Sequence, residues 1–579
     1  MSGLDVSSGT KQRRFWDWKW LILGLVTLIL LYQVLVPLFF LVFGSFKTVP
    51  PGHPDYLSLK LSLANYARAY GSAGFWQATQ NSFIFAACVS TLAFIVGSFL
   101  AWITERSNTP LRKLIFLLAV VRVIMPGILI TISWVLLLSP EIGILNQIFQ
   151  RLFDLASPPF NIYSLAGMIW VETVEVIPLA FLLMAGTFRS MDPNLEEASL
   201  TCRTGVFATF RRVTLPLALP SILSVYILLF LRVIDAFEVP AIIGMPAGIH
   251  VYSTKIYLTA TSAPADHGLA GAYAMTLLLL SAFLVSLYIR LTGEGARFVT
   301  ITGKAYRPRA FDLGSWKYAT CVSSLLLVFG TFGLAFFVIV WSSLLPFYQS
   351  PSWESFALVG LRNYHELWNY PFALNALKNS AILGLGSATV VMLLAALVSY
   401  IVVKTRLRGR ALLDILAFSP IAIPGMTLAL AVMWVYLVIP IPVYGTLWII
   451  FLAYVTKYMD VSTRIMSASF KQLSNELEEA SLVCRASWRR TFFVVLLPLL
   501  KPGFMAGWIW IIIHAFRELS IAMMLYYSGT EPISVAIFDL WEGGSYGVLA
   551  ALGVVVFAIM SFLVTISKKI SERFGVREA

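Results

Sequence analysis

Ionisable side chains interrupt the long apolar runs of this sequence, and their presence there needs an explanation. A charged side chain within a bilayer costs at least about 2.5 kcal/mol, so such residues usually serve the passage of ions or solutes. Those near the end of a run can also reach the interface with a long side chain. Besides Arg232, the candidates for a translocation pathway for a polar or ionic solute are Arg122, Glu172, Glu175, Asp235, Glu238, Lys457, Asp460, Arg517 and Glu518.

No pattern typical of a catalytic or metal centre accompanies these charges. The five histidines are scattered, and the four cysteines show neither metal-ligand spacing nor a disulfide framework. The phosphate-binding pattern G-x-x-x-x-G-K-[ST] is absent from the sequence. We therefore expect no catalytic residue, no metal site and no cofactor in this chain.

The composition indicates a membrane protein. Hydrophobic residues make up 59% of the 579 residues and charged residues only 12%, against about 25% charged in an ordinary globular protein. Long uncharged runs of about 20 residues are typical of transmembrane helices. We predict an all-α polytopic fold of about twelve spans, near 20–43, 78–103, 113–138, 165–188, 218–244, 268–292, 316–343, 377–403, 412–438, 444–468, 502–527 and 543–567.

The distribution of Lys and Arg predicts the orientation. With both termini in the cytoplasm, 31 of the 42 basic residues fall on that side and seven on the other, which is a strong positive-inside bias. The net charge of +13 then reflects basic clusters that face anionic headgroups. We therefore expect no nucleic-acid partner.

The sequence contains a tandem repeat. The two copies are offset by 298 residues at first and by 282 farther on, and each copy holds six spans in the same orientation, so the repeat is a parallel one. The matches include Asn65-Tyr66 with Asn363-Tyr364, Pro126-Gly127 with Pro424-Gly425, and Phe188 with Phe470. We divide the chain into a first span with its tail and outer loop (1–76), a first core (77–292), a linker (293–315), a seventh span with its outer loop (316–376), a second core (377–567) and a tail (568–579).

The best-matched stretch of the repeat lies between spans. Residues 196–220 read EEASLTCRTGVFATFRRVTLPLALP, and residues 478–502 read EEASLVCRASWRRTFFVVLLPLLKP. Each copy starts with carboxylates, continues as a basic helix and ends at prolines. The enclosing loops, 189–217 and 470–501, are longer than a minimal helix–helix connection, and such loops are usually functional. A single copy would be compatible with a solvated amphipathic loop, but two copies at equivalent places favour a docking surface.

These two segments resemble the EAA loop of the permease subunits of binding-protein-dependent ABC importers. The whole chain resembles the fused, two-core permeases of the ferric-iron-type branch, which implies a type I importer fold. In that family the loop forms a coupling helix that inserts into a cleft of an ATP-hydrolysing subunit. The resemblance implies that the coupling residues are Glu196, Glu197, Ala198, Ser199, Arg203, Leu215, Pro216, Glu478, Glu479, Ala480, Ser481, Arg485, Leu497 and Pro498.

The sequence departs from the family pattern at one position in each copy. Arg203 and Arg485 stand where the family has a glycine. Glycine would allow a tight, left-handed turn at low cost, so we expect this turn to be built differently here.

The resemblance also implies partners and a location. It implies two ATP-binding subunits on the cytoplasmic side, which would hold ATP and Mg, and a periplasmic or extracellular solute-binding protein. It implies a bacterial cytoplasmic membrane. The solute stays open, because fused relatives in this branch carry ferric iron, thiamine or small phosphonates. The alternative is an ion- or proton-coupled secondary transporter with two parallel six-helix halves, although such a transporter has no use for the duplicated coupling segment.

The repeat relates two of the charges within the spans. Glu175 and Lys457 are 282 residues apart and therefore occupy equivalent positions. We expect both to face the pathway and to pair across it in a closed state. The other possibility is a pair within one half, between Lys457 and Asp460.

Overall fold

The computed structural model describes residues 18–191, 204–295, 311–474, 476–484 and 486–573, and single residues (196, 198, 199, 201 and 202) between 192 and 203. Within these residues the regular structure is helical, apart from one isolated bridge between Ser107 and Phe311. In the described part of the chain, eight helices are long and apolar enough to cross a membrane, and three bent helix pairs bring the number of spans to as many as eleven. A shorter apolar helix, Leu447–Lys457, adds to these.

The first half contains α1 (Trp18–Ser45), η1 (Pro54–Leu57), α2 (Ala64–Gly71), α3 (Ala73–Arg106), α4 (Arg112–Val121), η2 (Arg122–Ile124), α5 (Gly127–Leu138), α6 (Ile144–Phe153), α7 (Leu165–Ser190), α9 (Val206–Thr209), η3 (Phe210–Thr214), α10 (Leu215–Ile234), η4 (Pro240–Gly244), α11 (Tyr252–Thr261) and α12 (His267–Gly295).

The second half contains α13 (Trp316–Val328), η6 (Phe329–Gly333), α14 (Leu334–Leu344), α15 (Trp353–Ala357), α16 (Arg362–Trp368), α17 (Pro371–Lys404), α18 (Arg410–Phe418), η7 (Ser419–Ala422), α19 (Gly425–Val438), α20 (Leu447–Lys457), α21 (Met459–Gln472), α22 (Glu476–Val483), α23 (Trp488–Arg490), η8 (Thr491–Leu496), α24 (Leu497–Leu499), α25 (Lys501–Arg517), α26 (Ser520–Leu525), α27 (Ile533–Glu542) and α28 (Tyr546–Arg573).

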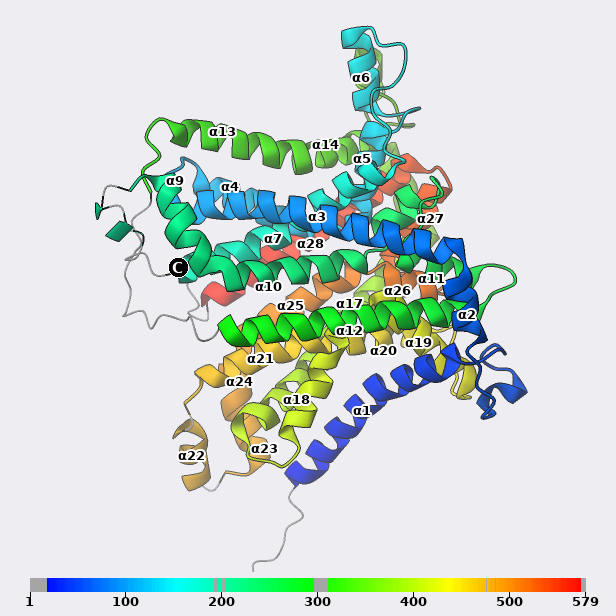
Figure 1. The fold of residues 1–579 in the computed structure, drawn as a ribbon, viewed down its shortest axis with the longest axis vertical. Helices are drawn as coiled ribbons and strands as arrows, with labels where there is room; N and C mark the ends of the chain where they lie inside the picture. The colour runs from blue at the N-terminus through cyan, green and yellow to red at the C-terminus, as the bar shows by residue number, and fades with distance from the viewer. Residues whose placement is uncertain are drawn as a thin grey trace, which may run out of the picture.

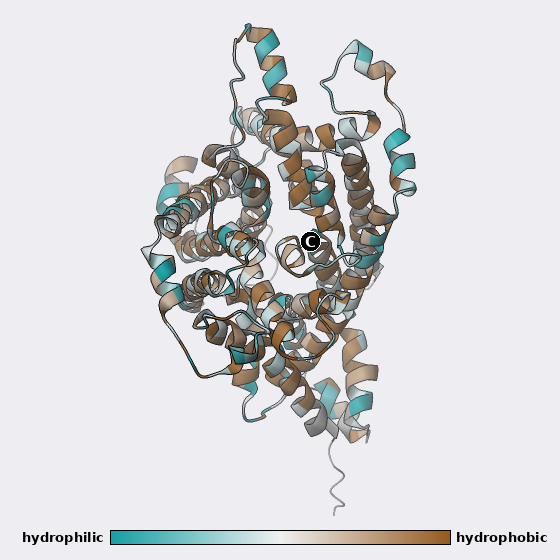
Figure 2. Ribbon diagram, turned by 90° about the vertical axis from the view of Figure 1, so that its right-hand side faces the viewer, coloured by the Kyte–Doolittle hydropathy of each residue, from teal (hydrophilic) through white to brown (hydrophobic). Residues whose placement is uncertain are grey.

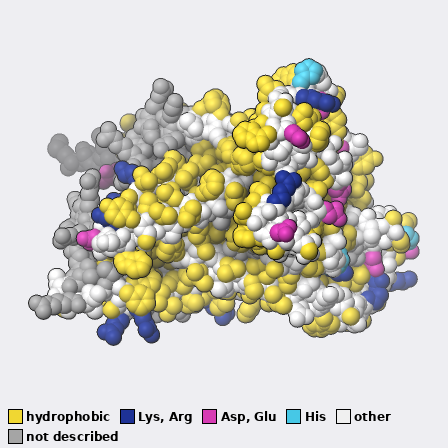
Figure 3. Space-filling view, turned by 90° about the horizontal axis from the view of Figure 1, so that it is seen from above, with side chains coloured by type: hydrophobic (Ala, Val, Ile, Leu, Met, Phe, Trp, Pro, Cys, Tyr) yellow, Lys and Arg dark blue, Asp and Glu magenta, His cyan; other side chains and the backbone are white. Residues whose placement is uncertain are grey.

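The long helices run side by side through the molecule (Figure 1). Hydrophobic residues dominate them when they are viewed end-on (Figure 2). On the face drawn in Figure 3, hydrophobic side chains cover most of the surface, and Lys and Arg gather mainly toward its two ends. A surface that is apolar between charged ends is what a lipid bilayer requires of a polytopic protein.

The third and ninth predicted spans are not continuous, which corrects the sequence-based expectation. The helix pair on either side of Pro126 is bent by 101°, and the pair on either side of Pro424 by 110°. A proline has no N–H to donate and forces the preceding residue out of the helical region. Accordingly Met125 and Ile423 are both extended, and a new helix, α5 or α19, begins directly after each proline.

The first span of each half packs against a bent span of the other half. Helix α1 of the first half packs against α19 of the second, and α14 of the second half packs against α5 of the first. The third and ninth spans are therefore each covered by a helix from the opposite half.

The internal repeat is visible in the hydrogen bonds. The side-chain amide of Asn65 donates to the carbonyls of Ser45 and Lys47, at 2.9 and 2.7 Å. The amide of Asn363 donates in the same way to Ser343 and Leu345, at 3.0 and 2.6 Å. The repeated asparagines thus fix the chain where the first span of each half ends.

One element has no counterpart in the second half. Helix α6 projects beyond the helix layer (Figure 1), and it lies in the segment that makes the first half longer. The equivalent connection, between α19 and α20, contains only turns.

Candidate functional site

The first repeated segment is anchored by a buried carboxylate. Glu196 is only 4% exposed. Its Oε2 lies 3.2 Å from Nη1 of Arg106, and its Oε1 accepts a hydrogen bond from the hydroxyl of Thr214 at 2.6 Å. Arg106 also donates to the carbonyl of Met191 at 2.9 Å. Glu196 therefore ties the segment to the end of α3 and does not face outward.

The carboxylate of the second repeated segment is bound by a neutral donor. Oε1 of Glu478 accepts a hydrogen bond from the hydroxyl of Tyr400 at 2.5 Å, and Nζ of Lys404 donates to the carbonyl of Leu473 at 2.6 Å. Glu478 is partly exposed and Glu479 is exposed. The carboxylate of Glu479 is thus open to a partner.

The two segments share one internal contact and one location. The hydroxyls of Ser199 and Thr209 lie 3.0 Å apart, and those of Ser481 and Thr491 lie 2.8 Å apart. Both segments, marked by α9 and by α22 to α24, lie at the same end of the molecule, on the left of Figure 1. Glu197, Arg203 and Arg485 lie outside the described residues. The predictions for these three residues remain predictions.

A second group of polar contacts lies where the third and ninth spans break. Both carboxylate oxygens of Asp235, which follows the last residue of α10, accept from the backbone N–H of Gly425, at 3.1 and 3.0 Å. Gly425 is the first residue of α19 and belongs to the second half. The end of a first-half span therefore contacts the break in a second-half span.

A corresponding contact runs from the second half to the first. Arg517 is the last residue of α25. Its Nη1 donates to the carbonyl of Val123 at 2.7 Å, and its Nη2 donates to Oε1 of Glu175 at 3.2 Å. Val123 and Glu175 belong to the first half. The end of a second-half span therefore contacts the break in a first-half span.

Asp235 and Arg517 occupy equivalent places. They are 282 residues apart, which is the offset of the repeat in this region. The next residues, Ala236 and Glu518, each accept a serine hydroxyl through the backbone carbonyl, at 2.6 and 2.7 Å. The repeat thus places an acid and a base at the same position of the two halves.

A family match decides what kind of protein carries these features. The family described as "Binding-protein-dependent transport system inner membrane component" matches residues 93–292 and again residues 388–574. The chain belongs to this family. It carries both copies of the permease domain in one polypeptide, so it is a fused, two-core permease of the ABC-importer class.

Relatives of this permease have been described in several bacteria. The ferric transport system permease protein FbpB of Actinobacillus pleuropneumoniae is 23% identical over 86% of this chain and 71% of its own length. The Fe(3+)-transport system permease protein FbpB 2 of Haemophilus influenzae is 23% identical over 80% of this chain and 84% of its own length. A putative 2-aminoethylphosphonate transport system permease protein, PhnV, of Salmonella typhimurium is 30% identical over 28% of this chain and 62% of its own length.

Most charges predicted for the permease pathway do meet in the structure. Besides the contacts of Asp235 and Arg517, Nζ of Lys457 lies 2.7 Å from Oε2 of Glu518. Arg232 is exposed and interacts electrostatically with Asp235 and with three glutamates, Glu172, Glu175 and Glu238. Asp460 is buried and accepts the backbone N–H of Val461 at 2.6 Å.

Neither of the pairs considered for Lys457 forms in this structure. Glu175 and Lys457 have different partners, Arg517 and Glu518, at 3.2 and 2.7 Å. No ion pair joins Lys457 to Asp460 among the described residues. The physical reason lies in the chain: α20 ends at Lys457 and α21 begins at Met459, whereas α7 continues unbroken past Glu175. Equivalent sequence positions therefore present their side chains differently.

Sequence reasoning missed the backbone part of this site. Gly127 and Gly425 were recognised as repeat markers, but each starts the helix that follows a break. A Cβ on Gly127 would lie 2.1 Å from Oε2 of Glu238 and 2.4 Å from Oε1 of Glu175. Glycine is needed there because the carboxylates approach the backbone closely. The repeated Pro-Gly pair was the signal that could have revealed both breaks.

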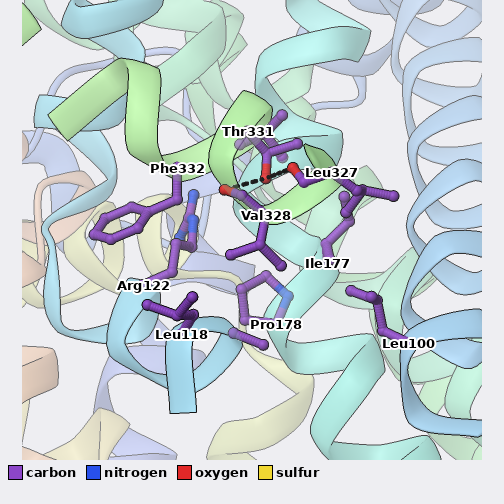
Figure 4. Close-up of a pocket in the computed structure, with 11 residues that line it drawn as sticks. Leu100, Leu118, Arg122, Ile177, Pro178, Leu327, Val328, Thr331 and Phe332 are labelled. Atoms are coloured by element: carbon purple, nitrogen blue, oxygen red, sulfur yellow. Dashed lines mark hydrogen bonds between the residues drawn. The ribbon is translucent and has the colours of Figure 1, made fainter. Parts of the chain in front are cut away.

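Arg122 lies beside this group, at the edge of a small cavity. Figure 4 shows its side chain beside Phe332 of η6, with Pro178 of α7 nearby. The cavity measures about 20 Å³, which is room for about one water molecule, so it cannot hold a solute. Arg122 is 3% exposed, and its Nε and Nη2 have no hydrogen-bond partner among the described residues.

Proposed function

We propose that this permease forms the translocation pathway of an ATP-driven importer for a small polar or ionic solute and is coupled to separate ATPase subunits. The observation that carries the proposal is the pair of matched segments at one end of the molecule, each held to its own half through a glutamate carboxylate. A protein that only conducts a solute needs no such pair of surfaces.

Two ATPase subunits, one for each segment, fit this arrangement. The exposed carboxylate of Glu479 would meet a basic cleft in its partner subunit, and Glu197 would do the same in the first half. ATP and Mg would be held by those subunits, and their closure would move the two segments toward each other. Because Glu196 and Glu478 are held by α3 and α17, a movement of either segment would be transmitted to the spans.

The solute we favour is of the ferric-iron type. Two relatives that match along most of this chain are named as ferric transport permeases, whereas the aminoethylphosphonate relative matches 28% of it. The charges at the two breaks suit a polar or ionic solute and not a lipid. A solute-binding protein on the outer face would deliver the solute and determine most of the specificity, so phosphonate and thiamine are the solutes to test next.

The proposed orientation puts both termini and the coupling segments in the cytoplasm of a bacterial inner membrane. It can be tested with single cysteines in a background without the four native ones. Lys113 and Trp353 are both exposed, Trp353 at 93%. In intact cells an impermeant thiol reagent should label Trp353→Cys and spare Lys113→Cys. Labelling of both from outside would contradict this orientation.

The coupling role is tested by charge reversal. Glu479→Lys should abolish solute-stimulated ATP hydrolysis in the reconstituted transporter, because like charges facing each other across an interface cost several kcal/mol, which is more than a hundredfold in affinity at about 1.4 kcal/mol per tenfold. Glu197→Lys should act in the same direction in the first half. The measurement is the ATPase rate with and without the solute-loaded binding protein.

The matched control is Glu366→Lys. Glu366 is an exposed carboxylate on α16, where it pairs with Arg362 at 2.7 Å, far from both coupling segments. This variant should keep normal stimulation. Normal stimulation in Glu479→Lys would contradict the coupling role, and solute uptake that continues without ATP but follows an ion gradient would favour the secondary-transporter alternative.

A further inference from the structure

The contacts of Asp235 and Arg517 are reciprocal and cross between the halves. Asp235 of the first half binds the start of α19 in the second half, and Arg517 of the second half binds the end of η2 in the first half. The two residues are equivalent under the repeat. The structure therefore has two crossed contacts of the same design, one at the break of the third span and one at the break of the ninth.

The charges suit the backbone groups that they contact. A helix N-terminus presents free N–H groups and a positive partial charge, which favours a carboxylate such as Asp235 at Gly425. A helix C-terminus presents free carbonyls and a negative partial charge, which favours a guanidinium such as Arg517 at Val123. This explains why side chains of opposite charge occupy equivalent positions: Asp235 binds the beginning of a helix, and Arg517 binds the end of another.

We propose that Asp235 and Arg517 form a clasp that holds the two halves together at the breaks of the bent spans, and that the clasp must open for a solute to pass between the halves. The contacts define the clasp itself, whereas its role in passage rests on the proposed function. The clasp is built from single side chains on backbone groups, so it opens without unfolding either half.

Opening the clasp would leave Glu175 without its partner, and Arg122 is placed to take over. Glu175 has one oxygen, Oε2, with no hydrogen-bond partner among the described residues, and Arg122 has two such nitrogens. The two side chains already interact electrostatically. An unpaired buried charge is costly, so an exchange of Glu175 from Arg517 to Arg122 would keep the open state accessible. Arg122 thereby acts as a positioning residue for the clasp.

The clasp can be tested by measuring the separation of the halves in the full-length chain alone. Leu63 and Leu361 are equivalent positions with 68% and 70% exposure. They precede α2, which packs on α12, and α16, which packs on α28, so each reports on its own half. Spin labels at Leu63→Cys and Leu361→Cys, in a background without the native cysteines, give the distance distribution by pulsed electron paramagnetic resonance.

The expected result is a graded shift. Asp235→Ala and Arg517→Gln should each add a population at longer distance, and the double variant should make it dominant. Asp235→Asn keeps one acceptor for the Gly425 N–H and should shift less than Asp235→Ala. The matched control is Arg464→Gln, which removes a pair with Asp414 (3.2 Å) within the second half and should leave the distribution unchanged. Distributions identical to that of the parent chain in all clasp variants would overturn the proposal.

The exchange to Arg122 has its own readout in thermal unfolding. Arg517→Gln leaves Glu175 with Arg122, and Arg122→Gln leaves it with Arg517, but the double variant leaves Glu175 with neither. The drop in Tm of the double variant should therefore exceed the sum of the single drops, as expected for coupled sites. Additive drops would overturn the exchange. Both measurements use the chain without ATPase or binding protein, so failure of the proposed function would leave their outcome unaffected.

Discussion

The two repeated segments, 196–220 and 478–502, have almost the same sequence pattern, but their carboxylates have different partners. In the first half, Arg106 forms a buried ion pair with Glu196. In the second half, Lys404 stands at the position equivalent to Arg106 and donates to the carbonyl of Leu473, just as Arg106 donates to the equivalent carbonyl of Met191. The carboxylate of Glu478, however, is bound by a tyrosine hydroxyl. The repeat therefore keeps the carbonyl contact but not the contact of the carboxylate.

One substitution on the neighbouring helix explains the difference. The position that Tyr400 occupies in α17 is held in α3 by Trp102, 298 residues earlier. Trp102 has only an indole N–H, which finds no partner among the described residues, so the carboxylate of the first segment depends on Arg106. Tyr400 supplies a hydroxyl, so the carboxylate of Glu478 does not depend on the basic residue. The carboxylate of the first segment is therefore bound by a cation and that of the second segment by a neutral hydroxyl.

The largest expected effect follows from removing the buried cation of the first half. Arg106→Gln leaves the carboxylate of Glu196 buried without a counter-ion, and the loss of one partner of a buried pair costs about 3–5 kcal/mol. Lys404→Gln in the second half should cost much less, because Glu478 keeps Tyr400. The free energy of unfolding of the purified protein, measured by chemical denaturation, checks the difference. Equal losses would show that the two anchors do not differ as described.

An intermediate effect is expected at the two breaks. Gly127→Ala would place a methyl group 2.1 Å from Glu238 and 2.4 Å from Glu175, whereas Gly425→Ala would meet Nζ of Lys457 at 2.8 Å and nothing else closer than 3.6 Å. Inserting atoms into a packed site typically costs about 1–3 kcal/mol, so Gly127→Ala should lower Tm and transport more than Gly425→Ala. A larger loss for Gly425→Ala would show that the second break is the tighter one.

The sequence predicts the architecture better than it predicts the contacts. Composition, the Lys/Arg bias and the repeat are properties summed over many residues, and they indicated a helical membrane protein of two halves with a matched segment in each half. The partner of a single charge depends on where other elements lie in space. Glu175 and Lys457 are equivalent in the sequence, but the interruption after Lys457 gives them different surroundings. No local pattern could have paired Arg517 with a backbone carbonyl almost four hundred residues away.

The breaks in the third and ninth spans were partly predictable from the sequence, less so than the architecture but more so than the single contacts. A proline in a long apolar run is compatible with a kinked but continuous helix. Mean hydropathy is taken over a window of many residues, so it does not reveal a break at a single proline. The Pro-Gly pairs at 126–127 and 424–425, repeated at the same offset, were a local signal for a break. Only the structure shows that each break is also the contact point for the opposite half.

The smallest effect is expected from the neutral anchor of the second segment. Tyr400→Phe removes only the hydroxyl that binds Glu478 at 2.5 Å. Because Glu478 is partly exposed, water can replace the lost donor, and a hydrogen bond to a charged group then contributes about 1.5 kcal/mol or less. The free energy of unfolding should fall by about this amount, well below the loss in Arg106→Gln. The coupling of ATP hydrolysis to solute should persist, because Glu479 stays exposed. If Tyr400→Phe destabilised the protein as much as Arg106→Gln, the second segment would be held as rigidly as the first, and the contrast between charged and neutral anchoring would be wrong.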